Sequence, residues 1–119
     1  LPTIVRKGYS STLVNDVPLI ERLNSALLKS GMVNEKTLLT KFTPITGSED
    51  VHMLVQDLDD VKIGYIFIGT ADPKLVKAAK AKGMAVPFAN HNPKYQVDLN
   101  SIPFGAKVAA INTMELLAE

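Results

Sequence analysis

A histidine in a turn is the residue of this sequence most suited to metal chemistry. His91 lies within Phe88–Pro93, which reads Phe-Ala-Asn-His-Asn-Pro. This stretch predicts irregular backbone, because a proline pushes the residue before it out of the helical region and asparagine favours turns. The imidazole can therefore point into a cleft and bind a metal ion. A lone turn histidine is more often a solvated or hydrogen-bonded bystander, so its neighbours must decide between the two interpretations.

Two other polar stretches accompany it, Thr12–Asp16 and Gly47–Asp50, and Gly69-Thr70 follows an apolar run. Within Gly-Ser-Glu-Asp, Gly47 permits close approach of a ligand and Ser48 predicts a helix N-cap, with Glu49 and Asp50 in the first turn. The N–H groups of such a helix start can bind a carboxylate or carbonyl oxygen. The alternative is a capping cluster with no further role. His52, just beyond, is expected to be structural or exposed rather than a ligand.

The elements that must position these residues alternate between helix and strand. Asn15-Asp16 predicts the start of an amphipathic helix that Gly31 ends. Strands are predicted at 38–45 and 63–68, the second as an apolar run covered on both faces. Further helices are predicted from Ser48 through Leu54, over 73–82 before Gly83, and from Ser101 through Leu117, the last largely buried because it is apolar over most of its circumference.

This order predicts an α/β fold, in which ligands bind at the carboxyl ends of the strands. Two strands do not make a stable sheet covered by four helices. We therefore expect further strands from elsewhere, so that the sequence is one segment of a larger domain or pairs with another chain.

Composition excludes several classes of protein. The 119 residues are 46% hydrophobic and 21% charged with a net charge of +1, which is globular and gives no electrostatic basis for binding nucleic acid or an anionic membrane. There is no cysteine, and no apolar run reaches the length of a membrane span. The sequence begins at Leu1 rather than Met, so a signal peptide ahead of it would not be seen here, and the residues do not decide the cellular compartment. A cytoplasmic location is our expectation.

The ordered set of Thr12–Asp16, Gly47–Asp50, Gly69-Thr70 and His91–Pro93 resembles the C-terminal part of the metal-dependent amidohydrolases and metallopeptidases that include hippurate hydrolase, N-acyl-amino-acid amidohydrolases and indole-acetyl-amino-acid hydrolases. No single motif is specific. The resemblance covers nearly the whole chain, from about Tyr9 to Leu117.

The resemblance implies a three-layer, zinc-peptidase-like catalytic domain interrupted by a smaller lid domain. Residues 1–14 would be a strand end and linker returning from the lid, and residues 15–119 the C-terminal part of the catalytic domain. It also implies a pair of zinc or manganese ions, with His91 as the last ligand and the other ligands and the general base outside this segment. Asn15 would be a hinge residue, and the Gly47, Ser48, Glu49 and Asp50 turn would line the cleft. Asn90 or Asn92 can orient the imidazole, with plain turn chemistry as the equal alternative.

The expected function is therefore hydrolysis of the amide bond of an N-acyl or N-aroyl amino acid, such as hippurate, by a longer parent that forms homo-oligomers. The segment alone is expected to be inactive and to bind metal weakly. The alternative is a free-standing, non-catalytic α/β binding or interaction domain.

Overall fold

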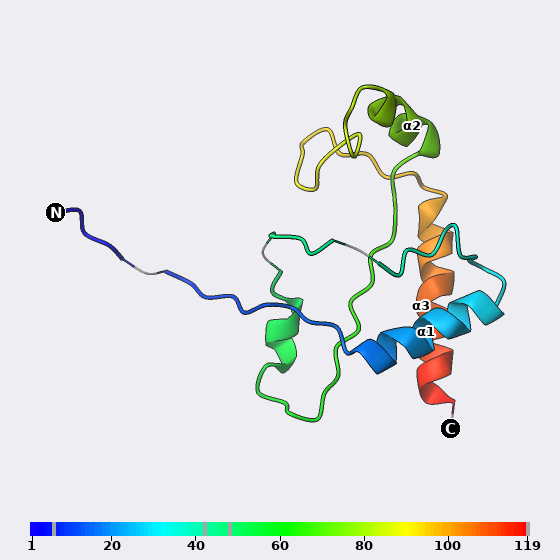
Figure 1. The fold of residues 1–119 in the computed structure, drawn as a ribbon, viewed down its shortest axis with the longest axis horizontal. Helices are drawn as coiled ribbons and strands as arrows, with labels where there is room; N and C mark the ends of the chain where they lie inside the picture. Colours follow the sequence, from blue (N-terminus) through cyan, green and yellow to red (C-terminus); the bar gives the residue numbers. More distant parts are fainter. Residues whose placement is uncertain (6, 42, 48, 119) are drawn as a thin grey trace. The chain divides into compact units, whose positions relative to one another are not determined.

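The secondary structure consists of helices joined by long irregular segments (Figure 1). A computed structural model describes residues 1–5, 7–41, 43–47 and 49–118. Within these ranges the elements are α1 (Val17–Lys29), the 3-10 helix η1 (Val51–Val55), α2 (Pro73–Ala81) and α3 (Ser101–Leu117). The chain divides into two compact units, Leu1–Tyr65 and Ile66–Glu119. In the described ranges, no helix is both long enough and apolar enough to cross a bilayer.

The α/β prediction is wrong, because the described residues contain no strand. A strand needs a neighbour to receive its backbone hydrogen bonds. In the run 63–68, Ile63 accepts a bond from the backbone N–H of Asp16 at 2.8 Å, and the Asn15 side chain takes both backbone groups of Tyr65. A loop and one carboxamide thus occupy the place of a partner strand. The second predicted strand, 38–45, is also irregular where it is described, and its Phe42 lies outside the described residues.

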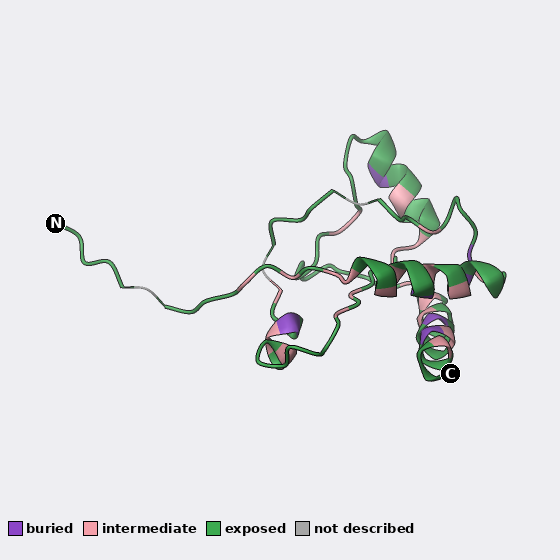
Figure 2. Cartoon of the chain, turned by 60° about the horizontal axis from the view of Figure 1, so that its bottom comes forward, coloured by how far each residue is buried: buried purple, intermediate pink, exposed green. Residues whose placement is uncertain are grey.

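The helix predicted after Asn15-Asp16 is confirmed as α1. The Asp16 carboxylate accepts a hydrogen bond from the N–H of Leu19 at 2.9 Å, Pro18 lies in the first turn, and Gly31 follows the helix with a φ of 71°. This positive φ is accessible to glycine without steric cost. The buried face of α1 carries Leu23 and Leu27, which are 4% and 2% exposed. Figure 2 shows that much of the rest of α1 is exposed.

The helix predicted after Gly47 exists only as the short 3-10 helix η1. Its predicted cap, Ser48, lies outside the described residues. Asp50 is the N-cap residue but makes no side-chain capping bond. The carboxylate of Glu49 instead accepts the N–H groups of Asp50 and Val51 at 2.9 and 3.2 Å. The carboxylate of Glu49, just ahead of η1, therefore occupies the N–H groups at the start of this helix.

The two later helices form where predicted. In α2 the Asp72 carboxylate accepts from the N–H of Lys74 at 2.6 Å, and Gly83 follows with a φ of 76°. In α3, Ser101 is the first helical residue rather than the cap. Gly105 of α3 packs against Ile68, because a Cβ built at this glycine would lie in van der Waals contact with Ile68 Cδ1, at 3.4 Å.

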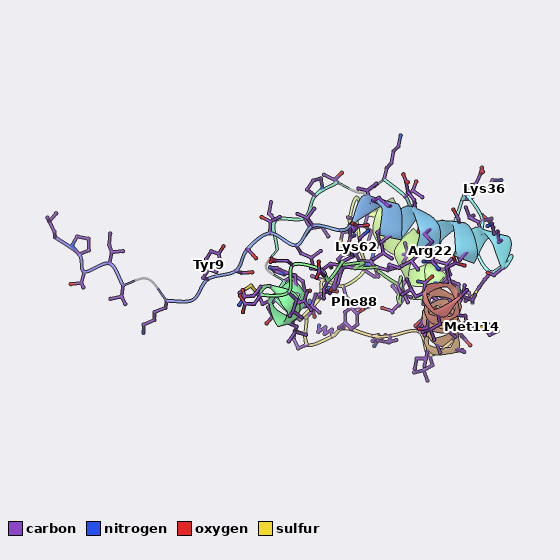
Figure 3. All side chains as sticks on the ribbon, turned by 90° about the horizontal axis from the view of Figure 1, so that it is seen from below. Tyr9, Arg22, Lys36, Lys62, Phe88 and Met114 are labelled. Carbon is purple, nitrogen blue, oxygen red and sulfur yellow. The ribbon has the colours of Figure 1, made fainter. Side chains whose placement is uncertain are left out.

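The prediction that α3 is largely buried is wrong. Its buried residues are Val108 and Asn112, whereas large apolar side chains on the rest of its surface are exposed, namely Ile102, Phe104, Met114, Leu116 and Leu117 (Met114 is labelled in Figure 3). A helix that is apolar all round needs cover on every side. The described residues supply that cover along one stripe only.

Capping by Asp16 should contribute measurably to stability. We expect Asp16→Ala to destabilise the chain by about 1 kcal/mol, because the N–H of Leu19 loses its acceptor. Asp16 also lies 3.8 Å from Lys62, which is labelled in Figure 3, but the lysine is largely exposed, so this ion pair adds little. Urea unfolding followed by helical circular dichroism measures the change. The exposed Asp57→Ala is the matched control, and equal midpoints for the two variants would contradict the capping role.

Candidate functional site

Tyr65 joins two of the polar stretches that the sequence singled out. The Asn15 carboxamide donates to the Tyr65 carbonyl oxygen at 3.0 Å and accepts from its N–H at 2.6 Å. The Tyr65 hydroxyl donates to Oε2 of Glu49 at 2.8 Å. Ser10 adds a bond from its Oγ to the Glu49 carbonyl oxygen at 3.0 Å. Asn15, Glu49 and Tyr65, hereafter the Tyr65 cluster, thus form one connected polar network within the first unit.

The carboxylate of Glu49 is stabilised in its charged form. Its hydrogen bond from the Tyr65 hydroxyl lowers its pKa most, and the bonds from the N–H groups of Val51 and Asp50 lower it further. The same bond raises the pKa of Tyr65, because a phenolate would face the carboxylate. Glu49 is therefore an oriented, half-exposed anion that can accept a hydrogen bond from an N–H group or attract a cation.

The remaining residues of the Gly47–Asp50 turn have weaker structural roles than expected. Gly47 is exposed, and a Cβ there would meet only Ile45 Cγ2 at 3.6 Å, an ordinary contact. The N–H groups expected to bind a ligand oxygen are those of Asp50 and Val51, which the Glu49 carboxylate already occupies. The anion-binding chemistry expected of this helix start is thus replaced by an anion that belongs to the chain.

A second polar contact lies next to the cluster. Ser11 Oγ and His52 Nε2 are 2.7 Å apart. His52 is 5% exposed, and among the described residues its Nδ1 has no hydrogen-bond partner. The expectation that His52 is structural or exposed agrees with its burial, but the serine on its ring was not anticipated.

His91 lies in the second unit, in a turn closed by a 3.2 Å bond from the N–H of Asn92 to the Ala89 carbonyl oxygen. Its φ is 65°. A positive φ at the third residue of such a turn is the type II arrangement, which glycine or asparagine usually occupies. The irregular backbone predicted here is confirmed. Its side chain is exposed, as is that of Asn90.

Asn92 stabilises a turn, which was the alternative to its orienting the His91 imidazole. Its Oδ1 accepts from the N–H of Lys94 at 2.8 Å, which closes the next turn of the loop.

The loop that carries His91 is also held to the segment after the apolar run 63–68. The hydroxyls of Thr70 and Tyr95 are 2.6 Å apart, and the N–H of Asp98 donates to the Thr70 carbonyl oxygen at 2.8 Å. Thr70 of the stretch Gly69-Thr70 thus supports the loop that carries His91.

These residues do not form a metal site by themselves. In the ranges that the structure describes, no group of three or more histidine and carboxylate side chains is placed to hold an ion. A catalytic zinc site uses three protein ligands. His91 can contribute one.

Comparison with family models, with curated proteins and with solved structures gives no match for this chain. The resemblance to the amidohydrolases therefore stays a hypothesis that rests on the motifs.

Removing the Tyr65 hydroxyl should raise the pKa of Glu49 towards its ordinary value. Tyr65→Phe deletes the donor that most favours the carboxylate. The folded-state pKa of Glu49 is lowered, so its stabilising bonds are present above about pH 4.3 and are lost as pH falls through the lowered value. Carbon NMR of the Glu49 carboxyl measures the titration. In Tyr95→Phe, which removes a hydroxyl in the other unit, we expect no change; an unchanged Glu49 pKa in Tyr65→Phe would contradict the hydrogen bond.

Proposed function

We propose that this chain is the C-terminal segment of the catalytic domain of a metal-dependent amidohydrolase of the hippurate hydrolase type. The parent hydrolyses the amide bond of an N-acyl or N-aroyl amino acid to a carboxylate and a free amino acid, and acts in the cytoplasm. The proposal rests on the ordered motifs around Asn15, Glu49, Gly69 and His91.

The observation that carries it is the Tyr65 cluster. The stretch Thr12–Asp16 and the turn Gly47–Asp50 are far apart in sequence, yet Asn15 and Glu49 bind the same tyrosine. Convergence of distant polar motifs is what a binding cleft requires, whereas helix capping alone needs only local contacts. In the proposed site Glu49 accepts a hydrogen bond from an N–H group of the substrate, and Asn15 holds the backbone beneath it.

In this proposal the metal ions are held by His91 together with ligands from the rest of the parent. His91 would supply one ligand of a zinc or manganese pair, and the described residues do not complete the set. Imidazole suits several metals, so one histidine does not choose between them.

Exposed apolar surface supports a larger assembly. Phe104, Met114 and Leu117 on α3 are 38%, 72% and 76% exposed, which is unusual for a helix of this apolar composition. Surface of this kind is normally covered by protein. In the proposal the rest of the catalytic domain covers it, and the parent forms a homo-oligomer.

The isolated 119-residue chain should neither retain metal nor hydrolyse hippurate. Elemental analysis after dialysis should find less than one equivalent of zinc or manganese, and release of glycine from hippurate should stay at the buffer rate. Metal-dependent hydrolysis by the isolated chain would contradict the proposal that most metal ligands and the general base lie in the rest of the parent.

The intact mass of the protein in its source cells separates the amidohydrolase from the alternative function. A parent a few times heavier supports the enzyme, and a polypeptide of this length supports a free-standing binding or interaction domain.

In the parent, His91→Ala should lower kcat by about a hundredfold or more, since it removes a metal ligand whose effect falls on the transition state. The unfolding free energy should change little, because the side chain is exposed. Gln96→Ala, in the same loop and also exposed, is the control and should keep wild-type turnover. Wild-type kcat for His91→Ala, with both metals bound, would show that His91 is not a ligand.

A further inference from the structure

The contact between Ser11 and His52 has the geometry of a nucleophile and its base. Ser11 Oγ lies 2.7 Å from His52 Nε2, within the range of a direct hydrogen bond. Ser11 is half-buried and His52 is 5% exposed. The serine is thus partly exposed, whereas the imidazole is shielded from water.

Within the described ranges, the Ser11 hydroxyl has two acceptors, and the imidazole is the stronger of them. The other is Met53 Sδ at 3.7 Å, and a thioether sulfur accepts hydrogen bonds only weakly. Donation to Nε2 requires that the neutral ring carry its proton on Nδ1. In the part of the chain that the structure describes, Nδ1 is buried without a partner, so packing rather than a third polar group holds the ring.

Glu49 carries a negative charge in the same unit, three residues before His52 in the sequence. The charges of Glu49 and His52 interact, and this interaction contributes to the lowered pKa of Glu49. An imidazolium formed at His52 during a reaction would therefore be offset in part by the Glu49 carboxylate.

We propose that Ser11 and His52 form a nucleophile and general base pair that takes an acyl group from small activated carboxylic esters. Ser11 Oγ bonds to the carbonyl carbon while its proton passes to His52 Nε2. Collapse of the tetrahedral intermediate breaks the bond to the phenoxy or alkoxy oxygen, which leaves with the electron pair and the proton. The product is an ester on Ser11. This activity needs no metal and does not depend on the proposed amidohydrolase function.

Ser10 is a built-in comparison for Ser11. It lies one residue away, and its Oγ donates to the carbonyl oxygens of Ser11 and Glu49 at 3.3 and 3.0 Å. Among the residues that the structure describes, no imidazole is hydrogen-bonded to it. General-base assistance contributes roughly a hundredfold or more to such a reaction. Acylation should therefore favour Ser11 over Ser10 by about this factor.

The test treats the 119-residue chain with p-nitrophenyl acetate and maps the acetyl groups by peptide mass spectrometry over time. We expect release of one equivalent of p-nitrophenol with the acetyl group on Ser11. Ser11→Ala should abolish that burst. His52→Phe keeps an aromatic ring in the buried position and should slow Ser11 acetylation to the rate at Ser10, with α1 retained by circular dichroism.

Equal acetylation of Ser10 and Ser11 in the wild-type chain would overturn the proposal, whatever the folding of the variants. An unchanged Ser11 rate in a folded His52→Phe would overturn it as well. Because no metal is added, these outcomes are independent of the hippurate assay.

Discussion

The two hydrogen bonds between the Asn15 carboxamide and the backbone of Tyr65 hold the first unit in the arrangement on which its site depends. They fix the residues ahead of α1 to the segment 63–65, and the bond from Asp16 N–H to Ile63 adds a third link. With its backbone held, Tyr65 can direct its hydroxyl to Glu49. A buried or half-buried peptide group left without a partner costs about 1–3 kcal/mol, so Asn15 stabilises a segment that would otherwise need a neighbouring strand.

The helices could be predicted because their signals are local. Asp16 and Asp72 each accept an N–H within three residues, and Gly31 and Gly83 adopt the positive φ that follows a helix end. Strands depend on pairing partners that sequence periodicity does not identify. The apolar run 63–68 has the composition of a covered strand, yet its bonds go to a side chain and a loop. The α/β prediction was wrong at this step.

The sequence predicts two of the residues of the candidate site but not the hydrogen bonds that join them. Glu49 and Asn15 stood out as polar residues beside turns, and the structure gives them a shared partner rather than separate roles. Tyr65 was missed because a tyrosine inside an apolar run reads as core. The only available signal was its hydroxyl, since a tyrosine in apolar surroundings usually directs that group to a polar partner. Ser11 was missed because it stands in a Ser-Ser-Thr cluster, which predicts a linker.

The backbone at His91 bears on its role independently of any resemblance. Its φ of 65° is a conformation that costs most residues about 1–2 kcal/mol and costs glycine almost nothing. Asparagine also tolerates this φ, and Asn90 and Asn92 lie on either side of His91. A turn displaced by one residue along the chain would place an asparagine at the position with positive φ. The ring itself is exposed and contributes little packing energy that would offset this cost. Histidine, with asparagine and aspartate, is among the non-glycine residues enriched at positive φ, so the turn can hold an exposed imidazole here without packing around the ring.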